Sequence, residues 1–91
     1  MQVTLEAAKK YLRVDSSDDD ALINGLIVSA ETLVNEVTRL NDEELQPYKK
    51  IVEIAELFTI AYLYEHREEA DHKSLTETVK YLLFPIRKEA F

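Results

Sequence analysis

Four carboxylates stand in two pairs of equal spacing, Glu53-x-x-Glu56 and Glu68-x-x-Asp71. Residues three apart on a helix share one face, so each pair could present two carboxylates to the same ion. Carboxylate oxygens are ligands that Mg²⁺ prefers, and protein-bound Mg²⁺ commonly holds substrate phosphates. The residue types therefore suggest a candidate Mg²⁺ site for phosphate chemistry.

This arrangement is similar to the Mg²⁺-binding pattern of the all-α nucleoside triphosphate pyrophosphatases. Such a site needs its two pairs on separate helices. Here only 11 residues separate Glu56 from Glu68, and Glu68 follows directly from the same apolar helix. A solvated charged face and a charged turn explain Glu53, Glu56, Glu68 and Asp71 more simply. We predict no catalytic residue, and we keep a pyrophosphatase-like enzyme as the alternative.

Other metal or nucleophile chemistry has less support. The chain has no Cys, which excludes disulfides and thiolate metal sites. Glu69-x-x-His72 matches half of a di-iron helix motif, but the second Glu-x-x-His is absent and the match falls in a predicted turn. The acidic run at residues 18–20 precedes a predicted helix, where carboxylates cap the N-terminus and favour the helix dipole. We predict no metal site and no cofactor.

The charge and the apolar runs narrow the class of partner. A net charge of −7 argues against binding nucleic acid through its phosphates. The apolar run over residues 52–64 is too short to span a membrane and contains two Glu, and residues 1–14 are charged throughout. We therefore expect no membrane partner and no signal peptide.

The helix signals are strong throughout the chain. Ninety-one residues with one Gly and two Pro predict one all-α domain over residues 1–91. Thr4 is a good N-cap for the first helix, and Ser74 with Glu77 reads as a capping box for the last, which Pro85 ends. The predicted bundle has a short N-terminal helix over residues 5–12, two long antiparallel helices over about 19–39 and about 47–67, and a short C-terminal helix between Ser74 and Pro85.

The apolar stripes predict which residues form the core, and some apolar residues lie outside these stripes. The second half of the helix over residues 47–67 is apolar on every side, so it should be surrounded by its own fold, by another chain, or by both. Val28, Ile60 and Tyr64 remain once each helix has faced its own core, and we predict them at a subunit contact. The core is expected to comprise Leu22, Leu26, Ala30, Leu33, Ile51, Ile54, Phe58 and Leu82.

The last eight residues carry a separate expectation. Pro85 should end the final helix and hold Phe84 extended. Phe84, Ile86 and Phe91 are costly to leave in water, and Arg87 adds positive charge to an acidic protein. We predict that residues 84–91 form a docking tail for a partner.

Several segments, in order along the chain, resemble the small head–tail connector (adaptor) proteins of tailed bacteriophages and prophages, a family associated with DNA packaging. Unlike many members, this chain has no Trp in its aromatic run and only a short acidic loop at residues 40–46. The matching segments are Leu5-x-x-Ala8-Lys9-x-Tyr11-Leu12-Arg13-Val14-Asp15, Asp18-Asp19-Asp20-Ala21-Leu22-Ile23, Leu26-Ile27-x-x-Ala30, Tyr62-x-Tyr64-Glu65-x-Arg67-Glu68 and Leu82-Leu83-x-Pro85-x-Arg87.

The resemblance implies a structural, non-catalytic subunit of a homo-oligomeric ring. The ring would sit below the phage portal protein, extend the DNA channel without binding DNA specifically, and receive a tail-completion protein. It would be assembled in the bacterial cytoplasm and remain in the virion. A helical regulatory module that binds a host protein is a further alternative. The acidic charge suits a conduit, because DNA should not adhere to it.

Overall fold

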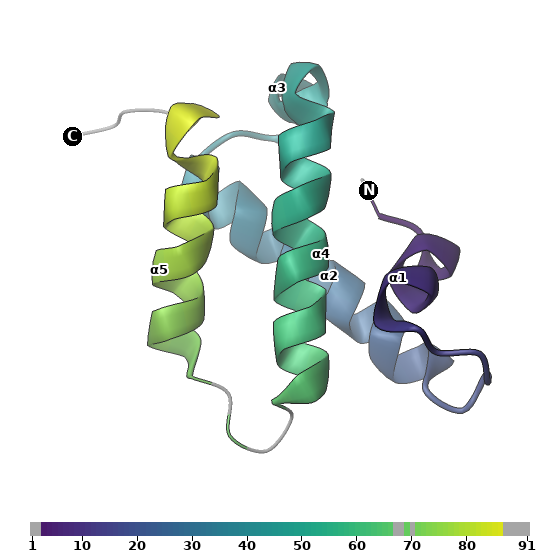
Figure 1. Ribbon diagram of the computed structural model, residues 1–91. Helices are drawn as coiled ribbons and strands as arrows, with labels where there is room; N and C mark the ends of the chain where they lie inside the picture. The colour runs from purple at the N-terminus through teal and green to yellow at the C-terminus, as the bar shows by residue number, and fades with distance from the viewer. Residues whose placement is uncertain (1–2, 67–68, 70, 87–91) are drawn as a thin grey trace.

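The computed structural model describes residues 3–66, 69 and 71–86, and every regular element in them is helical, which confirms the all-α prediction. In Figure 1, α4 and α5 lie side by side and run antiparallel, while α2 crosses obliquely behind α4 and α1 lies beside the N-terminal half of α2. The elements are α1 (Leu5–Leu12), α2 (Asp20–Thr38), α3 (Asp42–Leu45), the 3₁₀ turn η1 (Gln46–Tyr48), α4 (Lys49–Glu65), α5 (His72–Leu83) and the 3₁₀ turn η2 (Phe84–Ile86).

The N-terminal helix forms as its sequence predicts. The Thr4 hydroxyl accepts a hydrogen bond from the Ala7 N–H at 3.1 Å, which satisfies one of the free amides at the start of α1. Arg13 ends α1 and Arg39 ends α2, both in the left-handed conformation, with φ of 61° and 62°. Each cap donates its N–H back to a carbonyl of the last turn, as glycine does at many helix ends.

The expected acidic loop at residues 40–46 contains a short helix. The Asn41 side chain accepts from the Glu44 N–H at 2.8 Å, and the Glu44 carboxylate accepts from the Asn41 N–H at 3.0 Å. This reciprocal capping box starts α3, and its Asn-x-x-Glu signature was present in the sequence. The helical segment over residues 42–48 takes the place of most of that loop, and α4 leaves it at an angle to α2 (Figure 1).

Both ends of α5 differ from the sequence prediction. The helix begins at His72 because Asp71, not Ser74, is its N-cap, and the Asp71 carboxylate accepts from the Ser74 N–H at 3.0 Å. At the other end, Phe84 is helical, with φ −51° and ψ −44°, rather than extended. The bias against helix before proline is overcome because the Phe84 N–H still bonds the Tyr81 carbonyl, and the chain tightens into η2.

The residues that are buried lie along one edge of each predicted apolar stripe rather than along its middle. Of the expected residues, Ala30 is fully buried, most are half-buried and Ile54 is 58% exposed. The stripes are wider than the contact each helix makes, and the neighbouring helices cover only one edge of them. The fully or almost fully buried apolar residues of α2, α4 and α5 are Ile23, Ile27, Ala30, Val34, Val37, Val52, Ala55, Ile60, Leu75, Val79 and Leu83.

Candidate functional site

The three predicted subunit-contact residues have three different environments. Ile60 has no exposed surface, because it packs with Ala8, Ile23 and other residues of α1 and α2. The expectation that Ile60 is left over for a partner is therefore wrong for the free chain: α1, α2 and α5 all pack on α4. Tyr64 is half-buried beside the same cluster, whereas Val28 is 54% exposed on α2.

The carboxylates of the acidic run at the start of α2 bind side chains of other helices, and Asp19 makes no capping hydrogen bond to α2. Asp19 occupies the N-cap position without a capping bond, and its carboxylate accepts from the Tyr64 hydroxyl of α4 at 2.6 Å. Asp20 pairs with the Lys9 ammonium of α1 at 2.7 Å. These contacts join the start of α2 to α1 and α4, and they correct the prediction that the run simply caps a helix.

An exposed aromatic pair occupies the outer side of α5. Tyr81 is 82% exposed and Phe84 is 72% exposed, and with Glu77 and Lys80 they line a shallow hollow of about 230 Å³. On a 3.6-residue helix, Glu77 and Tyr81 lie about half a turn from the buried Val79 and so face away from the core. Tyr81 is not among the candidate residues predicted from the sequence, although its position opposite the apolar stripe of α5 was a usable signal.

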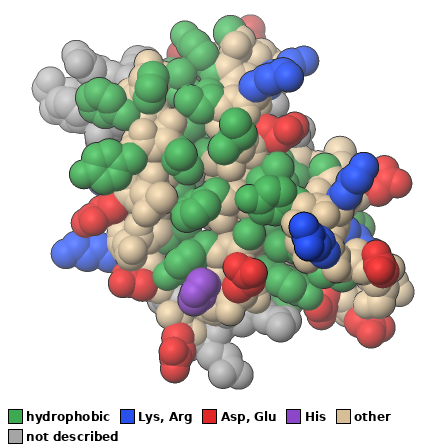
Figure 2. Space-filling model, in the orientation of Figure 1, with side chains coloured by type: hydrophobic (Ala, Val, Ile, Leu, Met, Phe, Trp, Pro, Cys, Tyr) green, Lys and Arg blue, Asp and Glu red, His purple; other side chains and the backbone are tan. Residues whose placement is uncertain are grey.

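The face seen in Figure 2 carries hydrophobic side chains over both α4 and α5. On α4, the 58% exposed Ile54 is followed at four-residue intervals by Phe58, Tyr62 and His66. The Phe58 and Tyr62 rings stack at 6.4 Å, and the Tyr62 and His66 rings stack at 4.3 Å. A surface with large exposed apolar residues of this kind is typical of a protein interaction site.

The C-terminal docking candidates are only partly described. Ile86 is half-buried and packs against the cluster formed by α2, α4 and α5, so this residue belongs at least partly to the fold. Phe84 is outside that cluster and exposed. Arg87 and Phe91 lie outside the described residues.

The candidate Mg²⁺ ligands are placed in different surroundings. Glu53 is exposed, Glu56 is 2% exposed, and Asp71 caps α5, while Glu68 lies outside the described residues. Glu56 is therefore not the solvated surface carboxylate that the sequence suggested. Over residues 3–66, 69 and 71–86, no three His, Cys, Asp or Glu side chains are placed to hold a metal ion.

The carboxyl group of Glu56 is the most unusual titratable group of the described chain. Burial, and then the negative charge of Glu31 on α2, raise the pKa of Glu56 from 4.5 to about 7. Its Oε1 atom accepts no hydrogen bond from the described residues. A carboxyl held in this way is largely neutral below neutral pH, and it acquires a destabilising charge as the pH rises through 7.

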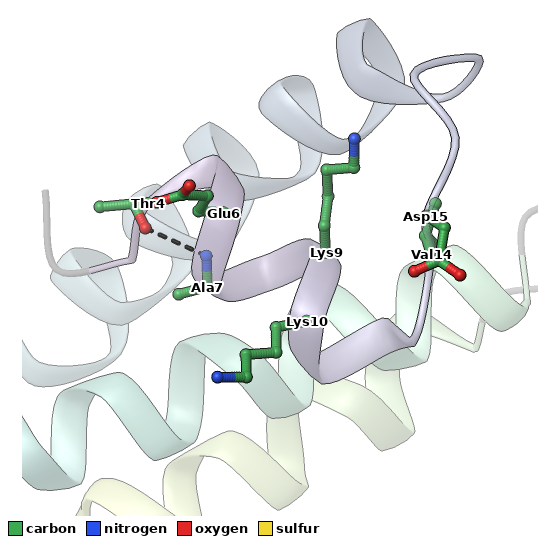
Figure 3. Close-up of a pocket in the computed structure, with 7 residues that line it drawn as sticks. All are labelled: Thr4, Glu6, Ala7, Lys9, Lys10, Val14 and Asp15. Atoms are coloured by element: carbon green, nitrogen blue, oxygen red, sulfur yellow. Dashed lines mark hydrogen bonds between the residues drawn. The ribbon is translucent and has the colours of Figure 1, made fainter.

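A second hollow lies beside α1, on the solvent side of the helix. Figure 3 shows Lys9 and Lys10 leaving α1 in opposite directions, with Thr4 bonded to Ala7 at one end and Asp15 at the other. The Lys9 ammonium is paired with Asp20 outside the hollow. The remaining charges are single and of both signs, a pattern that indicates no particular ligand.

A family model described as phage gp6-like head-tail connector protein matches residues 2–89, almost the whole chain. No curated protein and no solved structure matches. Among the described helices, none is long and apolar enough to cross a membrane.

Proposed function

We propose that this chain, which belongs to the phage gp6-like head-tail connector family, is a subunit that assembles with copies of itself into a ring at the junction between phage head and tail. The match over residues 2–89 is the observation that carries this proposal, because it includes every described helix. The exposed Val28, Ile54, Tyr81 and Phe84 support it, since large apolar side chains in water favour burial against another chain.

The ring would lie below the portal, continue the DNA channel and receive the tail-completion protein. The net charge of −7 supports passage of DNA without specific binding, because an acidic wall repels phosphates. The family is one of structural proteins, which agrees with a role in assembly and gives no support to the pyrophosphatase alternative. Assembly would take place in the host cytoplasm, and the finished subunit would remain in the virion.

The C-terminal segment is part of the same proposal. Phe84 is exposed, and Arg87 and Phe91 follow it in the sequence, so residues 84–91 offer apolar and basic groups to an acidic partner surface. Ile86 packs on the subunit itself, and so the docking part would lie on either side of it. Contact with the portal or with a neighbouring subunit would bury the aromatic groups, and the contact made by the basic groups would weaken at high salt.

The oligomeric state of the purified protein tests the ring. Mass photometry and negative-stain micrographs at several concentrations, with and without portal protein, should show closed rings in at least one condition. A subunit that stays monomeric with its portal present would contradict the proposal. Magnesium-dependent release of pyrophosphate from nucleoside triphosphates, lost in Glu56→Gln, would instead favour the enzyme.

Deletion of residues 87–91 tests the tail without removing Ile86. We expect a subunit with an unchanged cooperative melt that no longer joins heads to tails in a complementation assay. Arg87→Ala is the milder variant, and its defect relative to the parent should shrink at high ionic strength, where the charge attraction of the parent is screened as well. A truncated chain that loses its cooperative melt would show that the tail is part of the core.

A further inference from the structure

The outer face of α5 has no partner within the described subunit. Tyr81 and Phe84 are the most exposed large apolar residues of the described chain, at 82% and 72%. The exposed charges on the same face are Lys73, Glu77 and Lys80, so this face combines two aromatic rings with a positive bias. Such a face fits an apolar partner surface that is bordered by carboxylates.

The exposed face of α2 has the complementary properties. Val28 is 54% exposed, and a side chain added at Gly25 would meet nothing within 4 Å. Toward the C-terminus of the helix, the exposed residues on this face are Ser29, then Thr32 and Glu36, with about one turn from Val28 to Thr32 and another to Glu36. The face is thus apolar and open at one end, uncharged in the middle and acidic at the other end.

The spacing of the groups on the outer face of α5 matches the spacing of the groups on the exposed face of α2 when the two helices run antiparallel. Phe84 and Lys73 are 11 residues apart, and so are Gly25 and Glu36. Eleven residues are about three turns of helix, roughly 16 Å, and bring the side chain back to the same face. One antiparallel alignment therefore places Phe84 over Gly25, Tyr81 over Val28 and Lys73 opposite Glu36 together.

We propose that the outer face of α5 docks on the exposed face of α2 of a second copy of this chain, antiparallel and in this alignment. A single subunit cannot make the contact, because α5 packs against α2 from its buried side. The two faces differ, so the contact is heterologous and leaves one free face of each kind, as a ring requires. This inference rests on the proposed ring and specifies its interface.

The two ends of the contact have different roles. The absence of a side chain at Gly25 lets the Phe84 ring approach the α2 backbone closely. At the other end, Lys73 opposite Glu36 sets the direction of the helices and opposes the repulsion between two chains of net charge −7.

The middle of the contact pairs charged groups of α5 with uncharged groups of α2. In this alignment Glu77 falls opposite Thr32, and Lys80 falls opposite Ser29, both of which are exposed. The two hydroxyl groups can hydrogen-bond either charge, and no like charges face each other across the contact.

Disulfide trapping tests the contact directly, because the chain has no Cys of its own. The double variant Val28→Cys with Tyr81→Cys should give covalent ladders of subunits on mild oxidation of assembled rings. Val28→Cys with Tyr11→Cys is the matched control, since Tyr11 is another exposed tyrosine, 53% exposed on α1. Rings that form without a ladder, or a control that cross-links equally, would overturn this interface and leave the ring proposal intact.

Charge exchange at the end of the contact tests the alignment independently. Lys73→Glu or Glu36→Lys alone should raise the subunit concentration needed for assembly by about tenfold, and the double exchange should restore it. A double exchange no better than either single variant would overturn the alignment. Parent protein that forms no ring under any condition would instead refute the proposed function, and this inference with it.

A pair of lysine variants in the middle of the contact tests the same alignment without changing any existing charge. Thr32→Lys should lower the concentration needed for assembly, because the new ammonium group would face Glu77. Ser29→Lys is the matched control, since it alters the net charge equally but places the ammonium group opposite Lys80, and it should raise that concentration. Two variants that shift assembly in the same direction would contradict the alignment.

Discussion

The buried side of α4 and the exposed side of α5 both depart from the usual distribution, in which polar groups face water and apolar groups are buried. The two departures are in opposite directions. On α4, the residue Glu56 is only 2% exposed, and burial together with the negative charge of Glu31 raises the pKa of its carboxyl group. Tyr81 on α5 and Phe84, which directly follows α5, are more than two-thirds exposed. A polar group is thus buried in one helix, while large apolar groups face water in the next.

The two departures have different consequences. A buried carboxyl without a full set of hydrogen-bond partners acts on the folded state of the subunit, so its effect should appear in stability and in pH dependence. Exposed aromatic rings change little within the subunit, and their effect should appear on association. Stability measured on the monomeric subunit should therefore separate the interior of α4 from the outer faces of α5 and α2.

The largest effect is expected at Ile60. Ile60→Ala removes buried methyl groups from the contact of α4 with α1 and α2, and should lower the free energy of unfolding by about 3 kcal/mol in urea titrations. Ile54→Ala is the matched control on the same helix, with 58% of the residue exposed, and should change stability little. Equal losses at both positions would remove the distinction between the inner and outer sides of α4.

The next effect is the pH dependence caused by Glu56. Its folded pKa of about 7 lies above the value of 4.5 expected in the unfolded chain, so the folded state holds the proton more tightly. The stability that this proton provides is complete below pH 4.5 and is lost as the pH rises through 7. At about pH 8, Glu56→Gln should be more stable than the parent by roughly 1–3 kcal/mol, because the neutral amide avoids the buried charge.

The control for this prediction is Glu53→Gln, since Glu53 is exposed about one turn away on the same helix. Its stability should follow that of the parent across roughly pH 4–8. The measurement is the difference between variant and parent in urea unfolding at each pH, which cancels the other titrating groups. A difference for Glu56→Gln that does not change with pH would show that Glu56 keeps an ordinary pKa.

A smaller effect is expected where α4 meets the start of α2. Tyr64→Phe removes the hydroxyl that donates to Asp19 at 2.6 Å and should cost about 1–2 kcal/mol, as for a hydrogen bond to a charged group. Tyr11→Phe, on an exposed ring, serves as the comparison and should be neutral within the error of thermal melts. If the two variants melt alike, the bond to Asp19 adds nothing to stability.

The smallest effect on the stability of the subunit is expected at Gly25, where a substitution on an outer face should increase stability. Gly25→Ala should stabilise the monomeric subunit by about 0.5–1 kcal/mol, because alanine favours helix and its methyl group meets nothing within 4 Å. The same change should weaken assembly if an aromatic ring of a second copy rests there. A variant that gains stability and assembles normally would show that this part of α2 stays free.

Local sequence predicted much of the secondary structure. Thr4 caps α1 as expected, and the helix over about residues 19–39 appears as Asp20–Thr38, because caps and apolar periodicity act within one or two turns. The errors in predicting where helices begin were also local, because the Asn41 capping box and the Asp71 cap were both present in the sequence. Predicting these helix starts correctly required a choice among competing short-range signals.

The tertiary structure alone decided which side of each helix is inside. The sequence defined wide apolar stripes, but the edge that is buried depends on where the neighbouring helix crosses, so Ile60 became core and Ile54 remained exposed. The bond between Asp19 and Tyr64 joins residues 45 apart, and no local pattern specifies it. Burial of Glu56 near Glu31 has the same origin, because its environment is formed by a helix remote in sequence.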